Sequence, residues 1–154
     1  MPDSLDRDLL ILLHDVARQI RTRFDQRARE HGATRAQWTI LARLERKPGL
    51  SQNELAAVLE VEPITVARLV DKLEARGLVE RRADPNDRRI WRLHNLPSAR
   101  PIVEKITRYR EAINAELTEG MDDSVREAFI DALINMKNLL ADVETTKSLA
   151  VGSN

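Results

Sequence analysis

Apolar residues recur every three or four positions through most of this chain, which is the spacing of residues on one face of a helix. The first such segment runs from Leu5 to Glu30, and its apolar stripe is formed by Leu9, Leu13, Val16, Ile20 and Phe24. His31-Gly32 follows, and glycine readily adopts the left-handed conformation that ends many helices. The spacing therefore predicts a long amphipathic helix at the start of the chain.

Three shorter helices are predicted next, each with a recognisable start or end. Thr34 and Ser51 begin capping-box patterns, in which two side chains three residues apart bond free backbone N–H groups. Pro63 suits the first turn of the third of these helices, because its missing N–H costs nothing there. Lys47-Pro48-Gly49 and Arg76-Gly77 are stop signals. The residues expected to be buried are Trp38, Leu41, Leu44, Leu55, Ala56, Leu59, Val66, Leu69, Val70 and Leu73.

The apolar spacing changes from helical to alternating after Gly77. Leu78–Arg82 and Ile90–His94 are each predicted to form a strand. Between them, Asp84-Pro85-Asn86-Asp87 has the residue types of a tight turn. The pattern predicts a β-hairpin with a basic, exposed tip.

Helical spacing returns after Leu96-Pro97-Ser98. One helix is expected to about Gly120, with Ile102, Ile106, Tyr109, Ile113 and Leu117 on one face. Another is expected from about Asp122, presenting Val125, Phe129, Ala132, Met136, Leu140 and Val143. The predicted fold class is mainly α with a small β-hairpin wing, a winged helix-turn-helix flanked by N- and C-terminal helices.

Composition narrows the possible chemistry of these 154 residues. No cysteine is present, which excludes disulfides and thiolate ligands, and three scattered histidines do not make a metal site. We expect no metal and no cofactor. Phosphate-binding glycine loops and nucleophile motifs are absent, so an enzyme is not expected. No apolar run is long enough to span a bilayer, and the acidic start is unlike a signal peptide, so we expect a cytoplasmic protein without a membrane segment.

The charge is balanced overall but not locally. The chain has 25 basic and 25 acidic residues, whereas DNA-binding domains usually have a basic excess. From residue 76 to residue 92, however, six arginines accompany three acidic residues. These arginines are Arg76, Arg81, Arg82, Arg88, Arg89 and Arg92, and they give this stretch a local charge of +3.

The segment from Ser51 to Leu96 has the element order of a helix-turn-helix followed by a hairpin. In this motif the second helix enters the major groove of DNA, with apolar residues inward and small, polar or basic residues outward. Arg68 suits guanine, and Ile64 suits a thymine methyl group. Arginines at the hairpin tip suit phosphates or the minor groove, and Asp87 is placed to brace one of them. The candidate DNA-binding residues are Ser51, Gln52, Ile64, Thr65, Arg68, Lys72, Asp87, Arg88 and Arg89.

Several stretches together carry a resemblance to a known family. They are residues 37–44 (QWTILARL), 51–56 (SQNELA), 66–81 (VARLVDKLEARGLVER) and 84–89 (DPNDRR). With them the chain, from Leu5 to Val143, resembles the MarR/SlyA family of winged-helix transcriptional regulators. The resemblance implies a homodimer, in which the first and the last two helices of both chains intertwine. It also implies a pseudo-palindromic operator on double-stranded DNA, repression, and release by a small phenolic or lipophilic effector.

The resemblance also implies roles for individual residues. Asp87 and Arg89 match the Asp-x-Arg of the family wing, with Arg89 as the minor-groove arginine. Ile64, Thr65 and Arg68 match the base-reading positions of the recognition helix. The stretch 96–101 (LPSARP) departs from the family pattern, which raises the question of a changed angle between wing and long helix. The lack of cysteine excludes the thiol-based sensing of one branch.

The domain organisation follows from these assignments. Residues 1–32 and 97–146 are expected to form a helical dimerisation region, 33–96 the DNA-binding region, and 147–154 a tail. The dimer has support besides the resemblance, because the terminal helices have more apolar surface than one small core covers. Packing of these helices on each other within one chain is the competing interpretation.

Two further expectations concern aromatic residues. His14, Arg18 and Arg21 lie near one another on the first helix, and with Trp38 and Tyr109 they form a candidate effector pocket for an aromatic acid. Ordinary core and interface packing is the alternative for this set. Trp91, in the second hairpin strand, is expected to pack under the wing.

One other function stays open at this point. A winged-helix module that binds a protein rather than DNA would also fit a chain with zero net charge. The salt dependence of binding separates the two, since DNA binding weakens with salt in proportion to the phosphates contacted.

Overall fold

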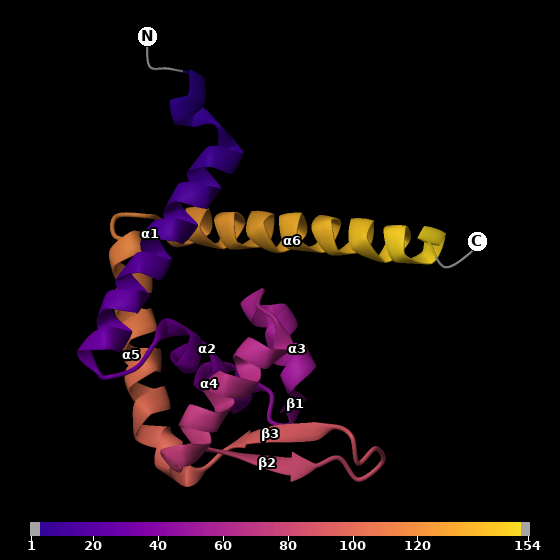
Figure 1. The fold of residues 1–154 in the computed structure, drawn as a ribbon. Helices are drawn as coiled ribbons and strands as arrows, with labels where there is room; N and C mark the ends of the chain where they lie inside the picture. Colours follow the sequence, from indigo (N-terminus) through magenta and orange to yellow (C-terminus); the bar gives the residue numbers. More distant parts are fainter. Residues whose placement is uncertain (1–3, 152–154) are drawn as a thin grey trace. The chain divides into compact units, whose positions relative to one another are not determined.

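The computed structural model describes the backbone of residues 4–151 and the side chains of residues 5–142. Six α-helices and three strands lie in this part of the chain (Figure 1). They are α1 Leu9–Glu30, α2 Arg35–Arg46, β1 Leu50–Ser51, α3 Gln52–Leu59, α4 Pro63–Ala75, β2 Val79–Ala83, β3 Trp91–Asn95, α5 Arg100–Leu117 and α6 Asp123–Val151. The chain divides into two compact units, the first ending at Tyr109 and the second beginning at Arg110.

The helix starts follow the capping chemistry of the sequence. The Thr34 and Ser51 side chains accept hydrogen bonds from the backbone N–H of Gln37 and Glu54, and both predicted capping boxes are confirmed. The predicted start of the first helix at Leu5 is wrong. Asp8 caps α1 instead, because its carboxylate accepts hydrogen bonds from two backbone N–H groups of the first turn. The residues before it, Ser4–Arg7, form a short 3-10 helix, η1.

The helix-turn-helix is formed by α3 and α4. Helix α3 ends at Leu59, and the next residue, Glu60, has a left-handed backbone with φ of 54°; α4 begins at Pro63 as predicted. The left-handed residue reverses the chain direction within three residues, so the two helices pack against each other. Glu62 precedes α4 and makes no side-chain capping bond.

The sheet has one strand more than the predicted hairpin. Its order is β1-β3-β2, with both pairs antiparallel. Strands β2 and β3 each lie one residue later than predicted. Strand β1 was not predicted, because two residues are too few to show alternation. It pairs Leu50 with Leu93, and both side chains are buried.

The core of the first unit is aliphatic and lies among α2, α3, α4 and the sheet. Eight of the ten predicted core residues are buried, and the other two, Leu59 and Leu69, are partly buried against the same cluster. From α5, Val103 and Ile106 also contribute to this core. The winged-helix segment therefore closes its own core, and this core fixes how α4 and the hairpin are presented.

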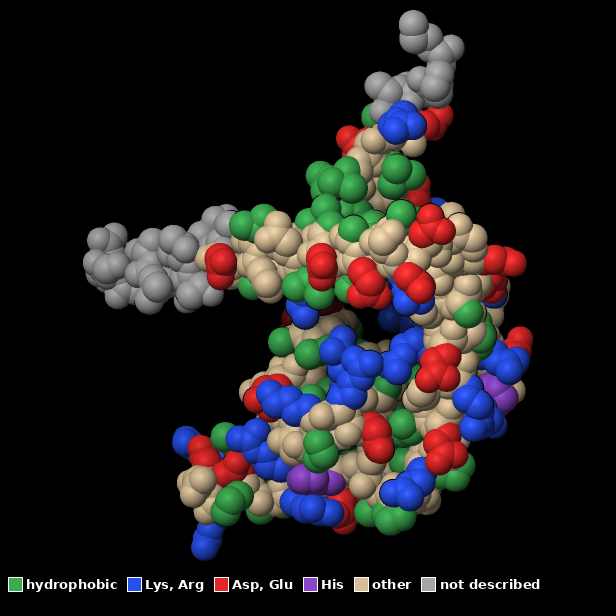
Figure 2. All heavy atoms as spheres, turned by 180° about the vertical axis from the view of Figure 1, so that it is seen from behind, with side chains coloured by type: hydrophobic (Ala, Val, Ile, Leu, Met, Phe, Trp, Pro, Cys, Tyr) green, Lys and Arg blue, Asp and Glu red, His purple; other side chains and the backbone are tan. Residues whose placement is uncertain are grey.

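The terminal helices leave much apolar surface exposed. In α1, Leu9 and Val16 of the predicted stripe are about half exposed, and in α6 Leu140 is 71% exposed. Figure 2 shows hydrophobic side chains on the surface of both helices. Helix α6 continues to Val151, through most of the predicted tail, while residues 152–154 and the side chain of Val143 lie outside the described residues. Among the described residues, no helix combines the length and apolarity that crossing a membrane requires.

Candidate nucleic-acid interface

Helix α4 has two chemically different faces. Val66, Val70 and Leu73 are fully buried in the core. On the opposite face the side chains of Ile64, Thr65, Arg68 and Lys72 are exposed, as the sequence predicted. Neither Arg68 nor Lys72 has an ion-pair partner among the described residues, so both cations are available to a ligand.

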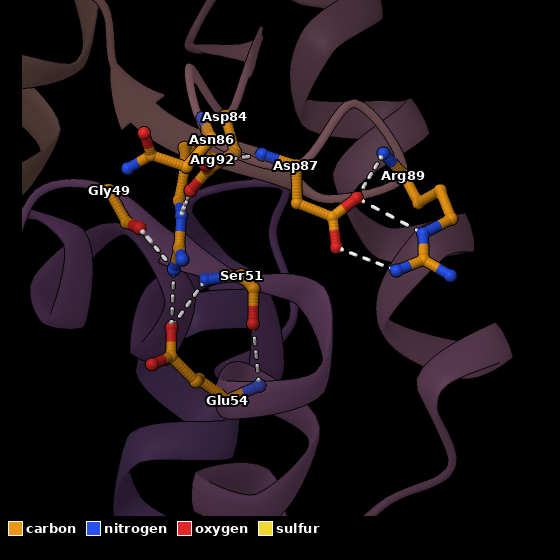
Figure 3. Close-up of polar contacts among 8 residues, drawn as sticks. All are labelled: Gly49, Ser51, Glu54, Asp84, Asn86, Asp87, Arg89 and Arg92. Atoms are coloured by element: carbon orange, nitrogen blue, oxygen red, sulfur yellow. Dashed lines mark hydrogen bonds and ion pairs between the residues drawn. The ribbon is translucent and has the colours of Figure 1, made fainter.

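The Asp84 carboxylate stabilises the hairpin tip. From the sequence, Asp84 was expected only as a turn residue. The Asp84 carboxylate accepts hydrogen bonds from the backbone N–H groups of Asn86 (2.7 Å) and Asp87 (3.0 Å), as Figure 3 shows. Asp84 also accepts a 2.7 Å bond from Nε of Arg92, which is the largest cause of the lowered pKa of the Asp84 carboxyl. The turn is therefore fixed from inside by one charged group.

Asp87 braces Arg89, as the sequence predicted for one of the tip arginines. Its carboxylate accepts bonds from the backbone N–H of Arg89 (3.0 Å), from Nε (3.1 Å) and from a terminal guanidinium nitrogen (3.1 Å). These bonds lower the pKa of Asp87 and raise that of Arg89 (Figure 3). The Arg89 side chain is nevertheless 90% exposed, so it is held in one direction while open to a ligand. Arg88 beside it is exposed as well.

Arg92 ties the wing to helix α3, a role the sequence analysis missed. Besides Asp84, its guanidinium contacts the backbone carbonyl of Gly49 (3.4 Å) and the carboxylate of Glu54 (3.3 Å). The pKa of Glu54 is lowered, chiefly because its carboxylate accepts the backbone N–H of Ser51. One arginine thus joins the hairpin turn, the residue before β1 and the first turn of α3 (Figure 3).

Arg81 makes the corresponding link from β2 to the helix-turn-helix. Its guanidinium donates to the Gln52 side chain (3.1 Å), the Ala67 carbonyl (3.2 Å) and the Asp71 carboxylate (2.6 Å). It is one of four arginines between residues 76 and 92 that form ion pairs, the others being Arg82, Arg89 and Arg92. Much of the local positive excess is therefore neutralised, and basic and acidic side chains alternate over the hairpin, at lower left in Figure 2.

Ser51 and Gln52 lie at the start of α3, beside the wing. The Ser51 hydroxyl accepts the backbone N–H of Glu54, which leaves its own O–H able to donate. Gln52 accepts from Arg81 through its side-chain oxygen, and its amide nitrogen has no hydrogen-bond partner among the described residues. Both residues line a hollow between α3 and β3, so they share one surface with Arg89.

The expectation that Trp91 packs under the wing is wrong. Its side chain is 47% exposed and borders the same hollow, which has a volume of about 300 Å³. By strand alternation Trp91 is on the same face of β3 as the buried Leu93. Other parts of the chain cover this face of the strand at Leu93 but not at Trp91, so the indole is exposed at the surface.

The five residues of the candidate effector pocket are not brought together. His14, Arg18 and Arg21 are exposed on α1, and Arg18 pairs with Asp15. The Tyr109 hydroxyl donates to the Arg23 carbonyl, and its ring packs edge-on against Phe24. Trp38 is 2% exposed and stacks on His31. Trp38 lines a cavity of about 110 Å³, whose other lining residues include His31, Arg76 and Lys105.

Comparison with known proteins places this geometry in a family. A profile of the MarR family matches residues 33–91, from just before α2 to the start of β3. A Thauera aromatica protein assigned to transcriptional regulation of the hcr operon is 30% identical over 105 residues, 66% of this chain and 61% of that protein. The chain thus spans less than two thirds of this relative's length.

Solved structures match over most of the chain. The crystal structure of MarR superposes with a TM-score of 0.78 at 29% identity, covering 94% of this chain and 97% of that one. A Listeria monocytogenes protein assigned to the same family, solved in complex with a 26mer DNA, superposes with a TM-score of 0.77 at 24% identity, covering 88% and 91%. The family profile, the relatives and the winged-helix architecture agree, and in sequence and fold the chain is similar to the MarR family of transcriptional regulators.

Proposed function

We propose that this regulator binds double-stranded DNA sequence-specifically through α4 and the wing. The observation that carries the proposal is the pairing of the exposed face of α4 with an exposed Arg89 fixed by Asp87. A preorganised guanidinium loses less freedom on binding than a mobile one. The Listeria relative solved with DNA supports the assignment, because its fold matches this chain.

Different residues would supply affinity and sequence recognition. Arg68 is placed to contact guanine edges, and Ile64 to contact a thymine methyl group in the major groove. Arg88 and Arg89 would contact phosphates or the minor groove. Arg68→Ala should therefore cost roughly 1–3 kcal/mol at one base pair, whereas Arg89→Ala should weaken binding to all sequences.

We also propose that the protein acts as a homodimer on a pseudo-palindromic operator. The exposed apolar residues of α1 and those of α6 each support this, since large exposed apolar residues gathered on a helix mark an interface. In this arrangement residues 1–32 and 97–146 carry dimerisation, and residues 33–96 contact DNA. Two lobes about one helical turn apart, roughly 10 bp, would bind half-sites together.

Repression and release by a small aromatic acid complete the proposal. A dimer seated on a promoter would block transcription, in the cytoplasm of a cell like those of the bacterial relatives. The cavity between Trp38, Arg76 and Lys105 combines an aromatic wall with two cations, the chemistry that suits an aromatic carboxylate. The proposed effector site therefore keeps Trp38 from the candidate pocket but does not include His14, Arg18, Arg21 and Tyr109. Benzoate, as a simple probe, should then lower DNA affinity, and Lys105→Ala should reduce that effect.

The test is selection of genomic fragments by the purified protein, followed by titration of the best fragment at several salt concentrations. A palindromic site bound by one dimer is expected. The logarithm of the binding constant should fall with log salt at a slope of about −0.9 per phosphate contacted. Lack of enrichment at low salt would contradict the proposal.

Binding of a protein partner through the wing is the second candidate function. The zero net charge of the chain and the four ion-paired arginines of the hairpin favour it. A protein-binding wing would leave the selected DNA unenriched, and any residual DNA association would be weak and independent of sequence.

A further inference from the structure

Trp91 is an exposed large aromatic residue on an otherwise polar wing. About half of its side-chain surface is open, although its neighbour two residues along β3, Leu93, is completely buried. Tryptophan has a large apolar face, and exposing it to water is unfavourable. A residue of this kind at a surface hollow is a common anchor for a binding partner.

The surroundings of Trp91 define the chemistry of that partner. The hollow of about 300 Å³ is bordered on one side by Arg89 and Trp91 and on the other by Ser51, Gln52 and Asn53. It therefore offers a flat apolar wall, an exposed cation and polar side chains that can donate hydrogen bonds. Arg92 and Glu54 also line it, and Arg92 is already paired with Glu54 and Asp84.

We propose that the Trp91 indole packs against the sugar–phosphate backbone of bound DNA, with one backbone segment lying in the hollow between β3 and α3. The inference rests on the proposed function, and it adds a contact that none of the charged residues supplies. A deoxyribose ring presents an apolar face with phosphates on either side. Arg89 and the polar side chains at the start of α3 line the same hollow, so they can contact the phosphates on either side of that sugar. Arg89 and Gln52 already belong to the proposed DNA interface.

The contact is expected to act on affinity rather than on salt dependence. Packing of an apolar face on a sugar releases no counterions, whereas a cation on a phosphate does. Trp91→Ala should weaken binding by roughly tenfold, comparable with loss of one aromatic contact to a nucleotide. The salt slope should remain at the wild-type value. Trp91→Phe should restore most of the affinity, because it keeps an apolar ring.

Fluorescence quenching by acrylamide tests the contact directly in the full-length protein. The chain has two tryptophans, and the other one, Trp38, is only 2% exposed, so the quenchable emission comes from Trp91. The probe is a short duplex cut from a genomic fragment that the protein enriches. Adding it should lower the quenching constant severalfold in the wild type and leave that of Trp91→Phe unchanged.

The outcomes separate this inference from the proposed function. If the wild type binds the duplex but Trp91 stays fully quenchable and Trp91→Ala binds with unchanged affinity, the inference is wrong and the proposed function stands. If the wild type binds no duplex at all, both are wrong. Protection of Trp91 that rises with protein concentration alone would identify a second copy as the occupant and would also overturn the inference.

Discussion

The winged-helix segment and helix α6 use their apolar residues in opposite ways. In α4, Val66, Val70 and Leu73 are completely buried within the chain. In α6, seven large apolar residues between positions 125 and 140 are each more than a third exposed. They are Val125, Phe129, Ile130, Leu133, Ile134, Leu139 and Leu140.

The difference shows that the apolar residues of the winged-helix segment are covered by the same chain, whereas those of α6 are not. The proposed DNA-binding surface rests on a core that this segment closes itself, so its geometry does not depend on a partner. Burial of one aliphatic side chain contributes about 1.5–3 kcal/mol, and α6 has not gained that contribution from its exposed residues. A partner surface that covers α6 would supply it.

A charge placed on the apolar face of α6 should produce the largest effect. Phe129→Asp puts a carboxylate where the proposed dimer is apolar, and burying it without a partner costs several kcal/mol. We expect association to weaken by about a hundredfold or more, seen as monomers in sedimentation experiments. DNA affinity should fall with it, since two lobes would no longer bind together.

The matched control is Asn138→Asp, an equal change of charge at a polar position of the same helix. It should leave the dimer intact. Unchanged sedimentation of Phe129→Asp would instead show that the apolar face of α6 is not the dimer interface.

The core of the winged-helix segment is tested by Leu73→Ala, which should reduce the free energy of unfolding by about 3 kcal/mol. The reason is local, because Leu73 is fully buried and its loss leaves a cavity in the winged-helix core. Urea unfolding at several protein concentrations measures the effect, and the loss should be the same at each. Lys72→Ala, the exposed neighbour, should change stability by less than about 0.5 kcal/mol. A concentration-dependent loss for Leu73→Ala would mean that this core, too, depends on the partner.

The same contrast explains which parts of the fold could be predicted from the sequence. Helices α2, α3 and α4 combine capping boxes, a helix-starting proline and apolar spacing, so local chemistry and core packing agree. Strand β1 has only Leu50 and Ser51, and it exists because β3 lies beside it. No window of sequence contains that information.

In the candidate site, too, a contact between residues close in sequence was predicted, whereas contacts between distant residues were not. A brace from Asp87 to one of the two tip arginines was predicted from their order, and the structure shows that this arginine is Arg89, two residues away. Arg92 bonds Asp84 and Glu54, and the second of these lies 38 residues away in the chain. Trp91 was expected to pack under the wing. It lies on the same face of β3 as Leu93, but how far the helices cover that face is a property of the assembled fold. The candidate effector residues are not gathered within one chain for the same reason, since Tyr109 and Trp38 pack against different neighbours.

Asp84→Ala should affect DNA binding more than folding. Asp84 accepts two backbone N–H groups of the tip and the Arg92 guanidinium, so its loss frees the turn that presents Arg89. Binding of the selected duplex should weaken by roughly five- to tenfold, as expected when a binding loop loses its preorganisation. Glu80→Ala, which removes an exposed partner of Arg82 on the same hairpin, is the control and should bind as the wild type does. Equal affinities for both variants would show that the tip is not preorganised by Asp84.

The smallest effect is expected from His94 and concerns pH. Its ring lies against Gly49, and burial, with Arg82 nearby, lowers the pKa of His94 below 6.5 despite the opposing influence of Glu80. The folded state therefore favours the neutral ring, so this stabilisation is complete above pH 6.5 and is lost as the pH falls through the folded-state pKa. Urea unfolding between pH 8 and pH 5 should show a modest decline that His94→Gln removes. The carboxyls of Glu54, Asp84 and Asp87 do not obscure it, because their pKa values are lowered from 4.5 and 3.8 and they titrate below this range. An identical decline in wild type and His94→Gln would assign the pH dependence to another group, and would leave the winged-helix core insensitive to pH over this interval.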